Sequence, residues 1–205
     1  MARPRYTAED RTAREKLVAA FWRLLALGPY AKLTVLEVVR AAELNKNTFY
    51  YHYSGIDELA EEAVQATLDP KALLAALSSV SIGDAGAPAS KTALDANLDR
   101  LCLVAGEHSS PALRQLLKDA LRGAWCEALA IDDAQLTLEQ RIGFEFALGG
   151  ALEVMAYRSR VATPFNFAVA AGVLVRNGVV DAVFRTIRPA AATTRAHADS
   201  ARHAE

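Results

Sequence analysis

The chain has 205 residues, a net charge of −1 and 52% hydrophobic residues, a composition typical of a soluble globular protein of one or two domains. Its two cysteines, Cys102 and Cys126, cannot form a disulfide framework and lack metal-ligand spacing. No apolar stretch is long enough to cross a bilayer, and no apolar signal segment follows the charged N-terminus. We therefore expect a cytoplasmic protein with no membrane segment, cofactor or bound metal.

Charge is unevenly distributed along the chain. Residues 1–54 hold nine Lys and Arg against five Asp and Glu, whereas the remainder holds fourteen against nineteen. A basic N-terminal part joined to an acidic remainder fits a protein with one surface for a polyanion.

Helical periodicity of apolar residues runs through most of the chain, and strand alternation is nearly absent. The sequence therefore predicts an all-α fold of about nine helices, the first of which ends at Gly28 and Pro29. The helices are expected at residues 8–27, 35–42, 46–53, 56–68, 70–80, 94–105, 111–125, 138–160 and 164–187. Between and after them, a loop is predicted at residues 81–90 and a disordered tail at residues 189–205. Residues 1–55 are interpreted as an N-terminal three-helix domain and residues 56–188 as a larger C-terminal helical domain.

Residues 34–59 are predicted to form two short helices joined by a tight turn. The first helix begins with a capping box, in which Thr34 accepts a hydrogen bond from a helix-end N–H and Glu37 reaches back. This helix is expected to bury Leu36 and Val39. The arrangement is typical of a helix-turn-helix, whose second helix enters the major groove of DNA.

The second short helix is predicted to have two different sides. At 100° per residue, Phe49 and Tyr53 fall together on one side, which suits a small core. Asn47 and Tyr51 point the opposite way. The flanks carry Lys46, Thr48 and Tyr50. Amide and ammonium groups can read base edges and tyrosine hydroxyls can bond phosphates, so the outer side suits DNA.

The letters NKNTFYYHYSGIDEL, residues 45–59, resemble the recognition-helix signature of the TetR family of regulators. The resemblance in letters covers about residues 14–60, and the remaining chain is similar in helix count and length only. It implies a transcriptional regulator that binds double-stranded DNA, with repression as the family default. The resemblance assigns Lys46 and Asn47 to bases, Thr48 to a base or a phosphate, Tyr50, Tyr51 and His52 mainly to the DNA backbone, and Thr34 to a phosphate. Many relatives carry a basic residue where this chain has Ser54, Gly55 and Ile56, which weakens the expected phosphate anchoring there.

The helices predicted at residues 138–160 and 164–187 are apolar around most of their circumference. The first opens with a second capping box, at Thr137. A helix without a polar face needs cover on two sides, so we expect these two helices to form a four-helix bundle with a second copy. The resemblance implies the same homodimer, and its two-fold axis calls for an inverted-repeat operator.

The resemblance further implies that a small-molecule effector binds inside the larger domain. Apolar side chains there suggest a mostly hydrophobic effector, and the predicted lining residues are Leu98, Cys102, Leu121, Trp125 and Phe146. His108, near a helix end, is expected to cap carbonyl groups rather than to bind an effector.

Two other functions remain open from the sequence. One is a constitutive DNA-binding protein with the same fold and a filled core. The other is a helical-bundle enzyme or carrier in which the Tyr and His side chains of residues 50–53 are buried. The sequence contains no nucleotide-binding loop, no catalytic Ser, His and Asp order and no metal motif, so it gives no support to catalysis.

Overall fold

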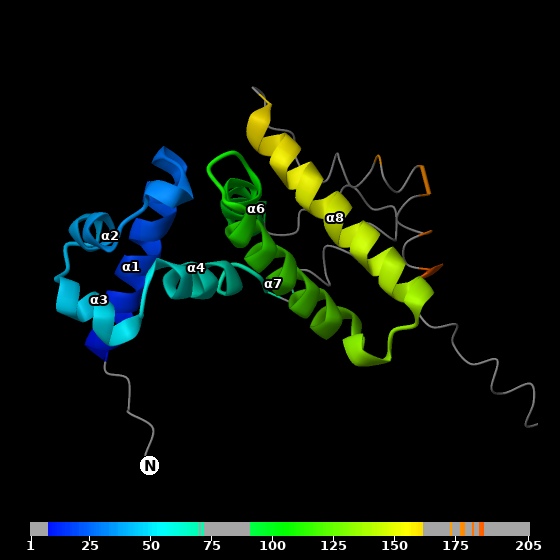
Figure 1. Cartoon of the computed structure of the whole chain (residues 1–205), viewed down its shortest axis with the longest axis horizontal. Coiled ribbons are helices and arrows are strands. Elements are labelled where there is room, and N and C mark those ends of the chain that lie inside the picture. Colours follow the sequence, from blue (N-terminus) through cyan, green and yellow to red (C-terminus); the bar gives the residue numbers. More distant parts are fainter. Residues whose placement is uncertain are drawn as a thin grey trace, which may run out of the picture.

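The computed structural model describes residues 8–69, 71, 91–161, 173, 177–178, 182 and 185–186. These residues form seven α-helices and two short 3-10 helices, with no strand among them (Figure 1). The elements are α1 (Ala8–Leu27), η1 (Tyr30–Lys32), α2 (Val35–Ala41), α3 (Lys46–His52), α4 (Ile56–Gln65), α6 (Lys91–Ala105), α7 (Pro111–Leu129), η2 (Asp133–Gln135) and α8 (Leu138–Arg160). The all-α prediction is therefore confirmed. The helices, loop and tail expected at residues 70–80, 81–90, 164–187 and 189–205 lie almost wholly outside the described residues.

Side-chain caps begin several of the helices. Thr34 and Thr137 both form the predicted capping boxes, each with its backbone N–H and side chain bonded to the residue three positions on. Ser110 accepts from the Leu113 N–H at 3.1 Å, and Pro111 occupies the first turn of α7, where its missing N–H costs nothing. The polar residues at these positions therefore satisfy N–H groups that have no partner inside the helix.

The helices α1, α2 and α3 pack together at one end of the molecule, and we call this part the head (Figure 1). Its core is built around fully buried aromatic and aliphatic side chains that include Phe21, Val38 and Phe49. The helix α4 packs along α1 and leads away from the head. It also touches α7, so it joins the head to the rest of the chain.

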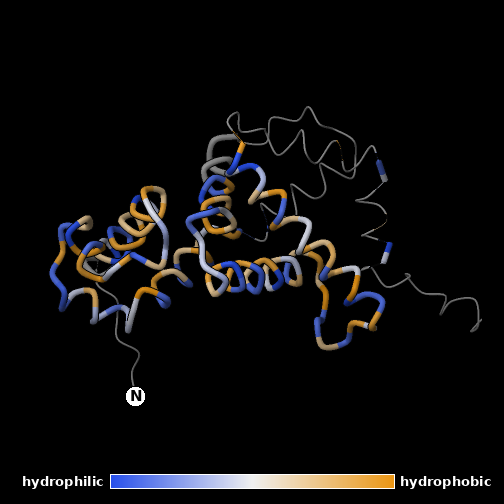
Figure 2. The backbone as a smooth tube through the Cα atoms, turned by 45° about the horizontal axis from the view of Figure 1, so that its top comes forward, coloured by the Kyte–Doolittle hydropathy of each residue, from blue (hydrophilic) through white to orange (hydrophobic). Residues whose placement is uncertain are grey.

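The helices α6, α7 and α8 pack against one another, and we call this part the body. Ion pairs supplement the buried Leu117, Phe144 and Leu148 between α7 and α8: Arg114 bonds to Glu153 at 2.6 Å and Lys118 to Glu145 at 2.6 Å. Every helix mixes hydrophobic and hydrophilic residues along its length (Figure 2). In the described part of the chain no helix is long and apolar enough to span a membrane.

Candidate nucleic-acid interface

The turn between α2 and α3 is held by backbone hydrogen bonds and by one unusual residue. Leu44 donates its N–H to the carbonyl oxygen of Val39 at 2.9 Å, and Ala42 donates to Val38 at 2.9 Å. Between them, Glu43 has a φ of 57°, in the left-handed region that favours glycine. The predicted tight turn is therefore present, and it carries conformational strain at Glu43.

The side of α3 that was predicted to face the core is buried. Phe49 is fully buried, and Tyr53, the residue that ends the helix, is 2% exposed. The Tyr53 hydroxyl donates to Glu62 on α4 at 3.0 Å, and the Arg14 guanidinium pairs with the same carboxylate while lying 5.7 Å from the Tyr53 ring centre. Burial raises the pKa of Tyr53 to about 12, with Glu62 adding to the rise and Arg14 opposing it. These contacts join α3 to both α1 and α4.

The outer side of α3 presents polar and aromatic side chains to solvent. Lys46 and Asn47 are exposed, Tyr50 is 51% exposed and Tyr51 is 67% exposed. His52 is half-buried, with its ring edge-on to Tyr51 at 4.9 Å between centroids. The Tyr and His side chains at residues 50–52 are thus not core groups, which is the arrangement that a DNA-reading surface requires.

Two contacts on this side restrict what its groups can do. Lys46 Nζ lies 5.6 Å from the centre of the Tyr50 ring, close enough for a cation–π contact that orients both side chains. The Thr48 hydroxyl donates to the Asn45 side-chain oxygen at 3.1 Å, while the same oxygen accepts from the Thr48 N–H at 2.8 Å. The Thr48 hydroxyl can therefore still accept a hydrogen bond, but its one proton is in use.

Thr34 has both of its donors in use as well. Its N–H and its hydroxyl donate to the same Glu37 carboxylate oxygen, at 2.9 and 2.7 Å. These hydrogen bonds, with the Thr34 hydroxyl first, hold the pKa of the Glu37 carboxyl below its usual range. Glu37 thus occupies the groups that the TetR resemblance assigns to a phosphate.

Ser54 repeats this arrangement at the end of α3. Its N–H and hydroxyl donate to Glu58 at 2.6 and 2.8 Å, which lowers the pKa of the Glu58 carboxyl. This pair was not predicted from the sequence, although Ser54 and Glu58 are four residues apart at a helix start, which is a signal for such a contact.

The expected burial of Leu36 is wrong. Its side chain is 49% exposed, and the buried residues of α2 are Val38 and Val39. Residues that are two apart in the sequence point about 200° away from each other around a helix axis. A seven-residue helix that buries Val38 therefore turns Leu36 outward.

Of the five residues predicted to line an effector site, Cys102 and Leu121 belong to one hydrophobic core cluster and Trp125 packs against it. Cys102 and Leu121 are buried and Leu98 is half-buried, whereas Trp125 packs edge-on against Phe144 at 5.9 Å between ring centroids. Phe146 is 68% exposed on the outer side of α8, which does not fit a site inside one chain.

An open pocket of about 470 Å³ lies in the body, beside the turn between α6 and α7. Its lining includes Ser109, Arg114, Lys118 and Leu152, and none of the five predicted residues. Among the residues that the structure describes, no group of three or more His, Cys, Asp or Glu side chains could hold a metal ion.

The head, with its capped α2, tight turn and outward-facing α3, is the helix-turn-helix of a DNA-binding protein. Residues 17–63 match the model of a family described as bacterial regulatory proteins, tetR family. The match begins within α1 and covers α2, α3 and most of α4. Residues 17–63 are therefore similar to the DNA-binding region of this family of regulators, and the similarity covers less than a quarter of the chain. A comparison with curated proteins gave no match.

Proposed function

We propose that the outer side of α3 enters the major groove and reads an operator sequence. Lys46 and Asn47 contact base edges, because ammonium and amide groups match the donors and acceptors displayed there. The hydroxyls of Tyr50 and Tyr51 and the His52 ring bond backbone phosphates, which positions the helix without reading sequence. The single observation that carries this proposal is the exposure of these side chains while Phe49 and Tyr53 are buried.

Two further groups adjust to DNA in this proposal. Thr48 accepts a hydrogen bond from a base amine, since its proton is held by Asn45. Thr34 bonds a phosphate only after Glu37 releases its hydroxyl, so this contact is the weakest of the set.

We infer that the active form is a homodimer assembled through α8 and residues 164–187. Leu138, Ile142 and Phe146 are spaced four residues apart on α8 and are 76%, 61% and 68% exposed. A Cβ built at Gly149 or Gly150 meets nothing within 4 Å, so the chain's own packing does not require these glycines. Exposed apolar side chains beside glycines allow a partner helix to approach closely and bury them.

A two-fold dimer requires an inverted-repeat operator, with half-sites about 34–36 Å apart or a multiple of that distance. Binding to such a site represses transcription by occupying promoter DNA. A small, mostly hydrophobic effector, bound in the body near Leu98, Cys102, Leu121 and Trp125, releases the DNA by favouring a different separation of the two heads.

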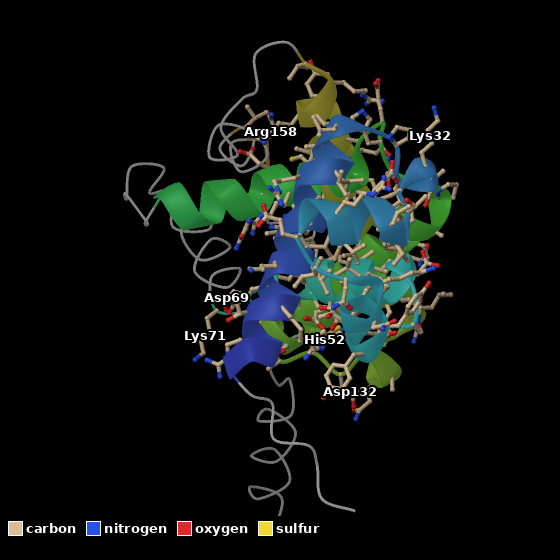
Figure 3. All side chains as sticks on the ribbon, turned by 90° about the vertical axis from the view of Figure 1, so that its left-hand side faces the viewer. Lys32, His52, Asp69, Lys71, Asp132 and Arg158 are labelled. Atoms are coloured by element: carbon tan, nitrogen blue, oxygen red, sulfur yellow. The ribbon has the colours of Figure 1, made fainter. Side chains whose placement is uncertain are left out.

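The experiment is selection of bound duplexes from a random pool by the full chain, followed by fluorescence anisotropy on the enriched sequence. An inverted repeat is expected, with affinity that falls steeply with salt because phosphate contacts release counterions. Lys46→Ala is compared with Lys32→Ala, which removes the same charge from an exposed position well apart from the His52 end of α3 (Figure 3). Equal losses in the two variants, or the absence of any enriched sequence, would contradict the proposal.

A further inference from the structure

The turn between α6 and α7, residues 106–110, is where the body meets the C-terminal end of α1. His108 in this turn makes two hydrogen bonds to the head. Its Nδ1 lies 2.8 Å from the carbonyl oxygen of Leu25, and its own carbonyl oxygen accepts from the Tyr30 N–H at 2.7 Å. Because a carbonyl only accepts, Nδ1 carries the proton. One residue of the body thus holds the head by both its side chain and its backbone, and the prediction that His108 caps carbonyl groups is confirmed.

The Leu25 carbonyl needs this donor because of Pro29. In an α-helix the carbonyl of residue 25 accepts from the N–H of residue 29, and proline has no N–H. The preceding pair is regular, since Gly28 donates to Leu24 at 3.1 Å. His108 therefore supplies, from the body, the hydrogen bond that α1 cannot complete by itself.

Two more contacts connect the head to the body or to α4 near this turn, and we call this contact region, centred on His108, the joint. The Arg100 guanidinium of α6 lies 5.8 Å from the centre of the Trp22 ring on α1. The buried Tyr30 hydroxyl donates to Asp57 in the first turn of α4. Burial raises the pKa of Tyr30, and the hydrogen bond to Asp57 acts in the same direction, so this hydroxyl stays a neutral donor. Through Tyr30, the hydrogen bonds of His108 are therefore connected to α4, the helix that follows α3.

The same turn is also held tightly from the body side. A Cβ built at Gly106 would lie 2.5 Å from the Ser159 Oγ and 3.1 Å from the Ser159 Cβ, so the turn passes directly against the end of α8. Arg114 on α7 donates to the Ala105 carbonyl at 2.6 Å. Since packed interiors transmit displacement rather than absorb it, a shift of α8 must move this turn.

We propose that His108 is a positioning residue that fixes the angle of the head on the body, and that the α6–α7 turn carries movement of the body to α3. This inference rests on the proposed function, because the angle matters to a regulator only if the head reads DNA. In a dimer the two angles set the distance between the two α3 helices. A displaced turn therefore changes which half-site spacing the protein fits.

The test compares His108→Asn with His108→Leu. The asparagine Nδ2 is as many bonds from the backbone as the histidine Nδ1, so it can donate to Leu25, while leucine has the same shape without a donor. Two readouts report on the joint without DNA. One is hydrogen exchange of the Tyr30 amide, whose acceptor is the carbonyl of residue 108. The other is acrylamide quenching of Trp22, which is 5% exposed and becomes the sole tryptophan in a Trp125→Phe background.

The leucine variant is expected to raise both Tyr30 exchange and Trp22 quenching, the exchange by about five- to tenfold, because one hydrogen bond closing the joint is lost. The asparagine variant stays within about twofold of the parent, as does Glu107→Gln at an exposed position of the same turn. Equal behaviour of the asparagine and leucine variants, or parental values for leucine, would overturn the role of the His108 donor.

Gly106→Ala tests the body side of the joint. Its methyl group would press on Ser159, so the turn must shift, and Tyr30 exchange is expected to rise as in the leucine variant. A folded Gly106→Ala protein with parental Tyr30 exchange would refute transmission through the turn. If this variant does not fold, the His108 pair still decides the proposal.

The last experiment measures binding to duplexes in which the spacing between half-sites differs by one or two base pairs. The parent is expected to discriminate among them by about tenfold, and His108→Leu by much less, because a looser head reaches both spacings. Identical spacing preferences in the two proteins would overturn His108 as a positioning residue. A parent that binds no duplex contradicts the proposed function instead, and the exchange and quenching results stand independently of it.

Discussion

The outer sides of α3 and α8 are both exposed and both carry aromatic residues, yet their chemistry differs. On α3 the exposed rings are Tyr50 and Tyr51, next to Lys46 and Asn47, so apolar area is combined with hydroxyl, ammonium and amide groups. On α8 the exposed residues Leu138, Ile142 and Phe146 have no polar atom in their side chains. The first surface can satisfy a polar, charged partner, whereas the second gains only by leaving water.

The two sides thus suit the two associations proposed for this chain, one with DNA and one with a second copy of the chain. Contacts to DNA are polar and weaken with salt, because they replace counterions on phosphates. Contacts between apolar helices are nearly independent of salt and follow the area buried. Mutations on the two sides should therefore be distinguishable by salt dependence as well as by size.

The largest effect is expected on α8. Phe146→Glu places a charge in the proposed dimer interface and should give a monomer in sedimentation velocity. With only one head per particle, affinity for an inverted repeat should fall by about a hundredfold or more, since the second head no longer binds at high effective concentration. The control is Gly123→Glu on α7, where the same charge enters open space. A dimeric Phe146→Glu protein would contradict the interface assigned to α8.

Substitutions on α3 should cost less and should divide into two kinds. Asn47→Ala is expected to lose about 1–3 kcal/mol on the selected sequence and to relax the preference at one base position. Tyr51→Phe keeps the ring, removes the phosphate contact and should weaken all sequences alike. Anisotropy titrations on the selected duplex and on single-base variants measure both. If Tyr51→Phe changed sequence preference and Asn47→Ala did not, the assigned roles would have to be exchanged.

The turn of the head offers a smaller effect on stability. Glu43→Gly should raise the free energy of unfolding by about 1 kcal/mol, because glycine adopts the left-handed conformation without a Cβ clash. Thermal unfolding measures the change, and Glu43→Ala, which keeps the Cβ, should show no comparable gain. Ala130→Gly is the matched change in the body, at a φ of 53°. No gain from Glu43→Gly would contradict the strain assigned to this turn.

Local signals were sufficient for much of the head. The spacing of Thr34 and Glu37 predicted the capping box, and the positions of Phe49 and Tyr53 predicted the buried side of α3. Helix periodicity failed at Leu36, because α2 is too short for its hydrophobic letters to define one face. Residue spacing in the sequence therefore predicts a contact when the two partners lie within one or two helical turns of each other.

The joint shows why contacts between distant parts of the chain could not be predicted from the sequence in the same way. Pro29 predicted where α1 ends, and it implies that the Leu25 carbonyl lacks its usual donor. The residue that replaces this donor is His108, 83 positions from Leu25, and no local pattern connects the two. Similarly, Phe144 rather than Phe146 faces Trp125, because the packing of α7 on α8 decides which side of an apolar helix is inside.

The smallest expected effect is a pH dependence of the head. Hydrogen bonds from Thr34 and Ser54 lower the pKa values of Glu37 and Glu58 in the folded chain, so each carboxylate stabilises the fold above its unfolded pKa. This contribution is lost as the pH falls from the ordinary value of 4.5 through the lowered folded value. The melting temperature should therefore decline over that interval more steeply in the parent than in Glu37→Gln, which retains the capping box without a titrating group. Because both carboxylates are exposed, the difference should shrink in high salt, and a variant with an unchanged slope would assign the acid sensitivity to other groups.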